Sequence, residues 1–450
     1  MPAVYGGGRA PWSEVAPHLV RRLQWTEPSF RGDVVEAGAL LAAGADGDAA
    51  RAAFEQLAAA ADMVVFIGIT DAAQSAFLLA RAAAVPCAVA FGCCEALAAA
   101  ARLHFQPATT LLAALARTLP WARGNRDAEL LESARELFAR NTPSDFVFAL
   151  LLLLDGAVAS VRTLTVNRQT SVGNIACMVR NCGSEVVGCV TDTDCKAALD
   201  CLEACGLNDQ VCSYQCITSH ESPKFESFSL CVLQKHNCLG NHAERPLLPA
   251  TAPMPAFRGA PLTHDAAEAL LVGWLRDAES LAPPEQQLRW SWKVVAGQNP
   301  AYDFFPAQHQ IFARGKGRSF WYDPVFKVRT LSGAWEWRRR HYRVKRDTEP
   351  GRFVLSVLDN GVTSLEHWAV VDVADDLSWG LFAYSGAAAA AGQSYGGAVF
   401  VTPDGAWPAA QHLERVRAAH AACGIQLFEL HVVDNSPELS AGAPLQLAEA

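Results

Sequence analysis

The chain has 450 residues, and two to four domains are expected because one domain usually has ~100–200 residues. Hydrophobic residues make up 51% of the chain and charged residues 18%, which excludes a disordered or fibrous protein. The net charge of −9 argues against a nucleic-acid-binding protein.

Helical and strand patterns alternate in the first part of the chain, residues 1–165. The apolar run 63–69 lies between two alanine-rich helical stretches, and a second apolar run, 87–91, follows. This order of strand, helix and strand predicts a parallel α/β domain. No glycine-rich nucleotide-binding motif precedes its helices, so we expect a regulatory or structural domain without a nucleotide cofactor.

Residues 146–154 carry no charge, but a membrane-spanning helix needs ~20 apolar residues. We therefore expect this segment to be a buried helix. The first thirty residues do not have the Arg/Ser-rich, acid-poor composition of an organelle transit peptide, and no targeting segment is evident.

Ten of the fourteen cysteines lie between Cys177 and Cys238, in a predicted helical domain over residues 170–240. No two of them are separated by two residues, the spacing typical of zinc sites, so a structural zinc ion is disfavoured. Their even number favours five disulfides, which require an oxidising compartment. These disulfides either only stabilise a small domain or also make it sensitive to reductants.

Helical spacing predicts which cysteines pair. Cys201 and Cys205 are one helical turn apart, as are Cys212 and Cys216, so the thiols of each pair share a helix face. Two such helices, packed antiparallel, would form the nested disulfides Cys201–Cys216 and Cys205–Cys212. The same nesting predicts the three remaining disulfides, Cys177–Cys195, Cys182–Cys189 and Cys231–Cys238.

The sequence pattern after residue 240 predicts a linker followed by a β-domain. Residues 241–285 begin with five prolines within sixteen residues, and Thr263 can cap a helix with apolar positions 270, 271, 274, 275 and 281. Residues 286–436 have short strand patterns and turn signals such as Asp359-Asn360-Gly361, which indicate a barrel or sandwich. We expect a helix over 408–423, a last strand over 427–433 and a tail over 437–450.

Three short motifs and the cysteine spacing together resemble one family. The motifs are Ser229-Leu230-Cys231-Val232, the stretch from Ala296 to Asp303, and Ser394-Tyr395-Gly396-Gly397-Ala398-Val399. They resemble violaxanthin de-epoxidase, most nearly its related-protein branch in plants and algae, over about residues 175–436. The resemblance implies a cysteine-rich helical domain followed by a lipocalin barrel. It also implies reduction of violaxanthin epoxides by ascorbate in the thylakoid lumen of the chloroplast.

The expected fold is therefore multidomain α+β, with an N-terminal α/β domain, a disulfide-rich helical domain and a C-terminal lipocalin-like β-barrel. An eight-stranded barrel can enclose one small ligand. The resemblance places the family's acid at Glu366, and Asp303 and Gln308 match an acidic and an amide position of the family. Glu366 and Asp303 are the catalytic candidates, and the substrate-binding candidates are Trp292, Gln298, Gln308, Trp368, Tyr384 and Tyr395.

Some family positions hold different residues in this chain. The two barrel tyrosines of the family fall on Ser385 and Val401, and Tyr384 is expected to face the opposite side of its strand from Ser385. The resemblance implies that two histidines near the barrel mouth sense lumenal acidity. These positions hold Gln310 and Ala313 in this chain, and the adjacent His309 leaves such sensing open. The family's barrel cysteine and its late partner fall on residues 307 and 437, where this chain has Ala and Pro.

Reductive opening of an epoxide needs a general acid for the leaving oxygen and an acceptor for the proton lost as the double bond forms. A carboxyl group in an apolar tunnel has a raised pKa and can be that acid at mildly acidic pH. We therefore expect a de-epoxidase of carotenoid substrates that uses ascorbate as co-substrate, without metal or nucleotide. The alternative is a non-catalytic lipocalin that binds a carotenoid or another apolar ligand.

A basic run over residues 338–346 allows two interpretations. It could contact anionic thylakoid lipid, or it could be a solvated face of alternating strand positions. No nucleic-acid partner is expected.

Overall fold

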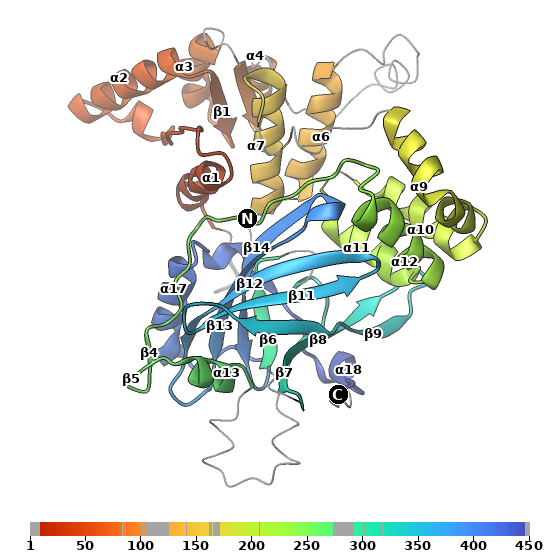
Figure 1. Ribbon diagram of the computed structural model, residues 1–450. Coiled ribbons are helices and arrows are strands. Elements are labelled where there is room, and N and C mark those ends of the chain that lie inside the picture. Colours follow the sequence, from red (N-terminus) through yellow and green to blue (C-terminus); the bar gives the residue numbers. More distant parts are fainter. Residues whose placement is uncertain are drawn as a thin grey trace. The chain divides into compact units, whose positions relative to one another are not determined.

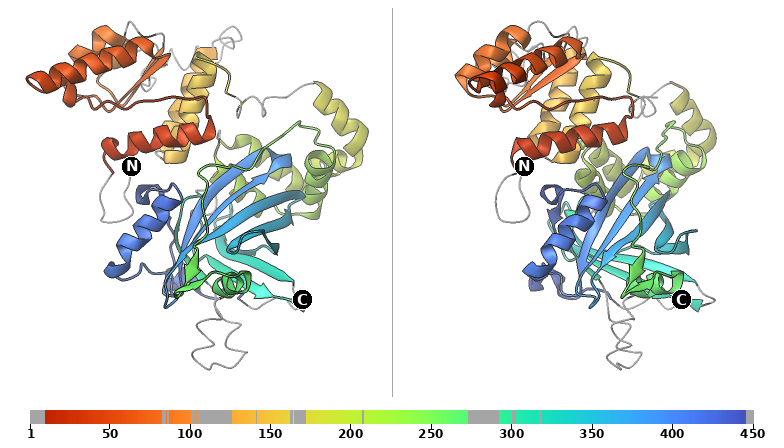
Figure 2. Two further views of the ribbon diagram at one scale, coloured as in Figure 1. Left: turned by 60° about the vertical axis from the view of Figure 1, so that its left-hand side comes forward. Right: turned by 90° about the vertical axis from the view of Figure 1, so that its left-hand side faces the viewer.

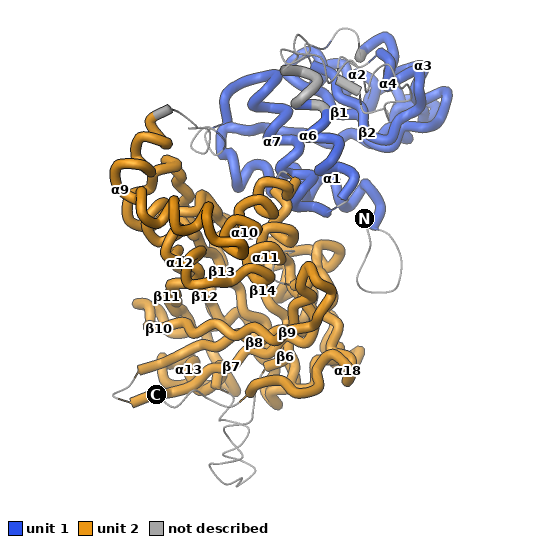
Figure 3. Tube along the Cα trace, turned by 90° about the vertical axis from the view of Figure 1, so that its right-hand side faces the viewer, with its two compact units in different colours: residues 1, 10–165 blue, residues 2–9, 166–450 orange. Residues whose placement is uncertain are grey.

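The computed structural model describes residues 10–82, 85, 87–100, 103–104, 126–140, 142–161, 164, 172–206, 208–272, 292–299, 303–316 and 319–445. Within these ranges the chain forms two compact units, which divide at residues 165 and 166 (Figure 3). In the described ranges, no helix is both long enough and apolar enough to cross a membrane.

The N-terminal unit contains the predicted parallel α/β arrangement. Strands β1 (Met63–Ile67) and β2 (Cys87–Phe91) pair in parallel, and the short β3 (Leu103–His104) pairs in parallel with β2. Every residue of β2 is buried, as a strand covered on both faces should be. The helices of this unit are α1 (Trp12–Thr26), α2 (Ala45–Ala60), α3 (Ala72–Ala82), α4 (Glu95–Ala100), α6 (Arg126–Arg140) and α7 (Pro143–Ala157).

The uncharged segment 146–154 lies in α7 and is largely buried, so the predicted buried helix is confirmed. Thr142 begins the helix, because its side chain accepts a hydrogen bond from the amide of Asp145. Phe146 then packs against Phe91 of the central strand, with ring centroids 5.3 Å apart.

The second unit begins with the cysteine-rich helical domain, coloured yellow to green in Figure 1. The side chains of Asp192, Asp209 and Ser222 accept hydrogen bonds from amides of the first turns of three helices, so polar caps determine where these helices begin. The domain consists of α9 (Val172–Val190), α10 (Thr193–Ala204), α11 (Gln210–Ser219), α12 (Pro223–Ser229) and a π-helical turn, η2 (Leu230–Lys235).

The five disulfides confirm two predicted pairs and correct three. Cys201–Cys216 and Cys205–Cys212 join α10 and α11 as the nesting predicts. The predicted pairs Cys177–Cys195, Cys182–Cys189 and Cys231–Cys238 are wrong: the observed pairs are Cys177–Cys238, Cys182–Cys231 and Cys189–Cys195.

The stretch of α9 that begins at a kink at Cys182 and runs to Val190 explains the correction. Seven residues of an α-helix rise by ~10 Å, whereas the Cα atoms of a disulfide are ~4–7 Å apart. Cys182 and Cys189 lie on this one helix and cannot bond to each other. Cys177 and Cys182 instead form disulfides with cysteines of the last segment of the domain, which contains η2. These two bonds link the end of the domain to its beginning.

The rest of the second unit contains an antiparallel barrel of eight strands (Figure 1). The pairing of β10 with β8 closes the barrel. The barrel order is β6, β7, β8, β10, β11, β12, β13 and β14, and β14 pairs again with β6. The barrel strands are β6 (Trp292–Gly297), β7 (His309–Arg314), β8 (Phe320–Arg329), β10 (Tyr342–Arg346), β11 (Arg352–Asp359), β12 (Val362–Val373), β13 (Gly380–Ala388) and β14 (Gln393–Thr402).

Two further short strands, which are not part of the eight, pair with strands of the barrel. Strand β9 (Trp335–Arg339) pairs with β8, and β15 (His431–Val432) pairs with β6. The predicted C-terminal helix is α17 (Leu413–Ala422), which lies at one side of the barrel (Figure 2). Val416 and Ala419 of this helix pack against the barrel. A short helix, α18 (Pro437–Ser440), follows.

The last predicted strand, over 427–433, is wrong in its first half. Residues Leu427–Glu429 form a 3₁₀ turn, and only His431–Val432 pair with the barrel. A capping box between Gln426 and Glu429 ends the extended conformation, because the Glu429 carboxylate accepts the amide of Gln426 at 2.9 Å.

The predicted turn between β11 and β12 is confirmed. Asn360 and Gly361 both have positive φ angles, of 47° and 79°, as a two-residue hairpin turn of type I′ requires. This turn sets the register in which Leu355 lies opposite Glu366. The sequence of the turn therefore helps to place a candidate catalytic residue.

The proline-rich segment covers one end of the barrel. It contains a small hairpin of β4 (Ala256–Phe257) and β5 (Ala260–Pro261), followed by α13 (His264–Val272). The Thr263 hydroxyl accepts the amide of Ala266 at 3.1 Å, so the predicted cap is confirmed. Three of the predicted apolar positions, 274, 275 and 281, lie outside the described residues.

Candidate functional site

A small cavity lies inside the barrel, and Glu366 and most of the predicted aromatic residues line it. Side chains of adjacent strand residues point to opposite faces, so Glu366 and Trp368, two positions apart on β12, both point inward. The other walls come from strands β7, β8, β10, β13 and β14 and from the loop after β6. The lining residues are Asn299, Gln310, Tyr322, Tyr342, Glu366, Trp368, Tyr384, Tyr395 and Val399.

Aromatic side chains hold Glu366 in place by hydrogen bonds. The indole Nε1 of Trp368 donates to Oε2 at 2.7 Å, and the hydroxyl of Tyr395 donates to Oε1 at 2.9 Å. Only 7% of the Glu366 surface is exposed. Burial raises the pKa of its carboxyl group, and hydrogen bonds from Trp368, Tyr395 and Tyr342 lower it in part. A carboxyl group of this kind can hold a proton at mildly acidic pH.

Stacked and tilted rings form the apolar part of the cavity. The Trp368 ring lies 5.6 Å from the Tyr384 ring and 5.0 Å from the Tyr322 ring. Tyr384 points inward, whereas the neighbouring Ser385 accepts a hydrogen bond from Arg245 on the other side of the strand. The two residues therefore face opposite sides, as strand alternation predicts. Burial raises the pKa of Tyr384 well above the ordinary value of a phenol, so its hydroxyl remains protonated.

Asp303, the second catalytic candidate, lies behind the cavity wall. Its Oδ2 accepts a hydrogen bond from the backbone amide of Asn299, with an N–O distance of 2.8 Å, and Asn299 lines the cavity. Burial raises the pKa of Asp303 to about 8. Its Oδ1 has no hydrogen-bond partner among the described residues. Gly297 makes room for this carboxyl group, since a Cβ at that position would lie 2.2 Å from the Asp303 Cγ.

Three predicted substrate-binding residues do not line the cavity. Trp292 is fully buried, and its indole donates to the carbonyl of Leu270 at 3.1 Å, which joins the covering segment to the barrel. Gln298 donates to Glu429 at 3.2 Å. Gln308 donates to the carbonyl of Phe305 at 2.8 Å, within its own loop. These three side chains therefore stabilise the barrel structure: their hydrogen bonds fix the covering segment and the loops in place.

Five cavity residues are not among the predicted catalytic or substrate-binding residues. They are Asn299, Gln310, Tyr322, Tyr342 and Val399. Gln310 is 1% exposed, and its Oε1 accepts a hydrogen bond from the Tyr322 hydroxyl. No described group accepts a hydrogen bond from its Nε2. The signal that could have found Gln310, Tyr322 and Tyr342 is the two-residue period of their strands.

His309, the histidine adjacent to Gln310, is buried near Trp337, with ring centroids 6.4 Å apart. Burial, together with the nearby Lys293, lowers its pKa to about 4. The His309 side chain therefore stays neutral at mildly acidic pH. It is poorly suited to sense a fall in pH, because its charge does not change in that range.

Ion pairs occupy much of the basic run 338–346. Arg339 pairs with Asp323, and Arg340 pairs with Glu221 and Asp359. Arg338 and Arg346 are paired with acidic side chains as well. These pairs favour a structural role for the run over an open cationic surface for lipid.

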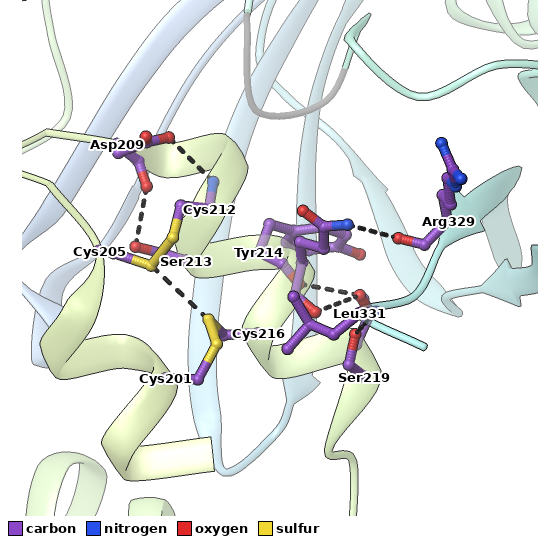
Figure 4. The surroundings of a disulfide bond; sticks show 12 residues. Cys201, Cys205, Asp209, Cys212, Ser213, Tyr214, Cys216, Ser219, Arg329 and Leu331 are labelled. Carbon is purple, nitrogen blue, oxygen red and sulfur yellow. Dashed lines mark hydrogen bonds between the residues drawn. A yellow bond between two sulfur atoms is a disulfide. The ribbon is translucent and has the colours of Figure 1, made fainter. Parts of the chain in front are cut away.

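The cysteine-rich domain contacts the barrel through α11, which carries Cys212 and Cys216 (Figure 4). The ring of Tyr214 lies 5.3 Å from that of Phe305, two residues after Asp303. Gln215 also donates to the carbonyl of Arg329 at 2.7 Å. The disulfide-bonded helix therefore supports the loop that holds Asp303.

Comparison with known proteins identifies the second unit. A family model described as the VDE lipocalin domain matches residues 174–435. Violaxanthin de-epoxidase, chloroplastic, from Arabidopsis thaliana is 21% identical over 185 residues, which cover 40% of this chain and 35% of that protein. This chain thus spans about a third of the length of the curated relative that it matches.

Solved structures also match at low identity. Apocrustacyanin C2 is 11% identical, with a TM-score of 0.26, and the match covers 43% of this chain and 93% of that chain. Lobster apocrustacyanin A1 is 12% identical, with a TM-score of 0.26 and coverage of 44% and 96%. The siderocalin Ex-FABP is 10% identical, with a TM-score of 0.25 and coverage of 35% and 97%.

Proposed function

The chain belongs to the family of the VDE lipocalin domain, and from this membership we propose that it is a xanthophyll de-epoxidase, or a close relative, that reduces carotenoid epoxides with ascorbate. The observation that carries the proposal is the buried carboxyl group of Glu366 inside an aromatic-lined barrel cavity. Such a cavity suits an apolar ligand with one reactive polar group.

The proposed reaction delivers two protons to the epoxide oxygen, and Glu366 is the proposed donor in the cavity. Glu366 gives its proton to the epoxide oxygen as the carbon–oxygen bond breaks. Ascorbate supplies two electrons and two protons and becomes dehydroascorbate. One of these protons restores the proton of Glu366 and the other goes to the oxygen, which leaves as water, and the two ring carbons become a double bond. Because burial raises the pKa of Glu366, the protonated form is available at mildly acidic pH. Asp303, also buried, is the proposed second proton carrier.

The five disulfides support an oxidising location for the mature protein. The curated relative is described as chloroplastic. We place the proposed reaction in the thylakoid lumen, where the carotenoid would come from the adjacent membrane.

The test is to incubate the oxidised protein with violaxanthin, ascorbate and galactolipid at acidic pH and to measure zeaxanthin by chromatography. We expect zeaxanthin to form with the unchanged protein and with Glu414→Gln, a control on the exposed side of α17. Glu366→Gln should lower the rate by ~10²–10⁴-fold, the usual contribution of a general acid.

Two results would contradict the proposal. Pigment binding without any product would leave a carotenoid-binding lipocalin that does not catalyse the reaction. Absence of both binding and product would exclude a carotenoid ligand altogether.

A further inference from the structure

Gln310 and Glu366 lie on opposite walls of the barrel. In the closed order of eight strands, β7 and β12 are four strands apart in either direction. Both side chains line the cavity, so a ligand end group inside it lies between them.

Gln310 presents a buried hydrogen-bond donor without a protein partner. Its side chain is 1% exposed, and the Tyr322 hydroxyl donates to its Oε1, which fixes the orientation of the amide. The Nε2 has no acceptor within the described part of the chain. A buried polar group without a partner costs free energy, which a ligand oxygen bonded to it would recover.

We infer that Gln310 is a specificity-determining residue whose Nε2 donates a hydrogen bond to an oxygen of the ligand's end ring, on the side away from Glu366. This inference rests on the proposed function, because it places the epoxide at Glu366. The preferred ligand then has a ring with a second oxygen, such as the hydroxyl of a xanthophyll. An amide does not titrate, so this recognition is independent of pH.

Zeaxanthin and β-carotene test the inference, because their rings differ only in a hydroxyl group. Binding of each pigment is measured by quenching of tryptophan fluorescence in the oxidised full-length chain. We expect the unchanged protein to bind zeaxanthin ~10-fold more tightly than β-carotene, as one hydrogen bond to a buried donor would give. Gln310→Met should abolish this preference and leave the affinity for β-carotene unchanged.

Two further variants separate recognition from folding. Tyr322→Phe keeps the ring and removes the hydroxyl that orients Gln310, so it should lower the preference in part. Gln393→Met makes the same change at an exposed position of β14 and should leave the preference intact. Melting curves show whether each variant is folded.

Equal loss of affinity for both pigments in Gln310→Met, or an unchanged preference, would overturn the inference while the proposed ligand class stands. Failure of the unchanged protein to bind either pigment would overturn the inference and the proposed function together.

Discussion

The Tyr395 hydroxyl reaches the Glu366 carboxylate at 2.9 Å across an intervening strand. Glu366 on β12 is paired with Gly386 on β13, and Gly386 is paired with Tyr395 on β14. The glycine has no side chain, so the residues on either side of it can touch. A row of three paired positions thus holds the candidate acid in place.

Tyr395→Phe should move the pKa of Glu366 further above its ordinary value. The hydroxyl donates to the charged carboxylate and stabilises it, so its loss favours the protonated form. The basic limb of the pH–rate profile should therefore shift to higher pH, and an NMR titration of labelled glutamate should show the same direction. Tyr384→Phe is the matched control, because no hydrogen bond joins that hydroxyl to Glu366 among the described contacts. A shift to lower pH in Tyr395→Phe would contradict this prediction.

Gly386→Ala should disturb the site. The added Cβ would lie 2.9 Å from the Glu366 Cγ and 3.0 Å from the carbonyl oxygen of Leu365. Overpacking of this kind costs ~1–3 kcal/mol in the free energy of unfolding. In contrast, a Cβ at Gly396 would have its nearest contact at 3.5 Å, so Gly396→Ala should be tolerated. Urea denaturation and pigment binding of both variants measure the difference, and equal effects would refute the argument.

Local sequence signals predicted much of this structure. The Asn360-Gly361 turn and the Thr263 cap depend on residues that are adjacent in the chain, and both are confirmed. Gln310 and Tyr322 were not predicted as cavity residues, although they lie on strands. The two-residue period shows which side chains share a face, but closure of the barrel decides which face is the interior.

The disulfides also show that local sequence signals predict contacts between neighbouring segments but not between distant ones. Cys201–Cys216 joins neighbouring helices, and helical spacing alone predicts it. Cys182–Cys231 joins residues 49 apart, and its prediction requires knowing that the chain is helical from the kink at Cys182 to Cys189, so that these two cysteines cannot pair. Pairing between distant cysteines depends on the tertiary fold, which the spacing does not contain.

Removal of Cys182–Cys231 should cost more stability than removal of Cys189–Cys195. Because Cys177–Cys238 already joins the two ends of this segment, the shortest loop that Cys182–Cys231 closes runs through that disulfide and spans ~12 residues, whereas Cys189–Cys195 closes a loop of 6. Loop-closure entropy gives ~3 kcal/mol for the first disulfide and ~2 kcal/mol for the second. Denaturation of the two double Cys→Ser variants under non-reducing conditions measures this difference. Non-reducing peptide mapping checks the pairing, and a Cys182–Cys189 peptide would contradict it.

Asp303→Asn should make stability less dependent on pH. The folded state holds the Asp303 proton more tightly than the unfolded state, because burial raises its pKa from 3.8 to about 8. Folding therefore takes up a proton between these values, and the stability that this group contributes is lost as pH rises through the window. The maximum slope for one proton is ~1.4 kcal/mol per pH unit.

The measurement is the free energy of unfolding, from urea titrations at several values between pH 4 and about 8. We expect the unchanged protein to lose stability with rising pH more steeply than Asp303→Asn. Part of the slope should remain in the variant, because the raised pKa of Glu366 acts in the same direction. Asp376→Asn is the control: a hydrogen bond from Ser378 lowers the pKa of Asp376, so its titration in the folded state falls below this window. Parallel curves for Asp303→Asn and the unchanged protein would mean that Asp303 is charged in the folded state and cannot store a proton beside the cavity.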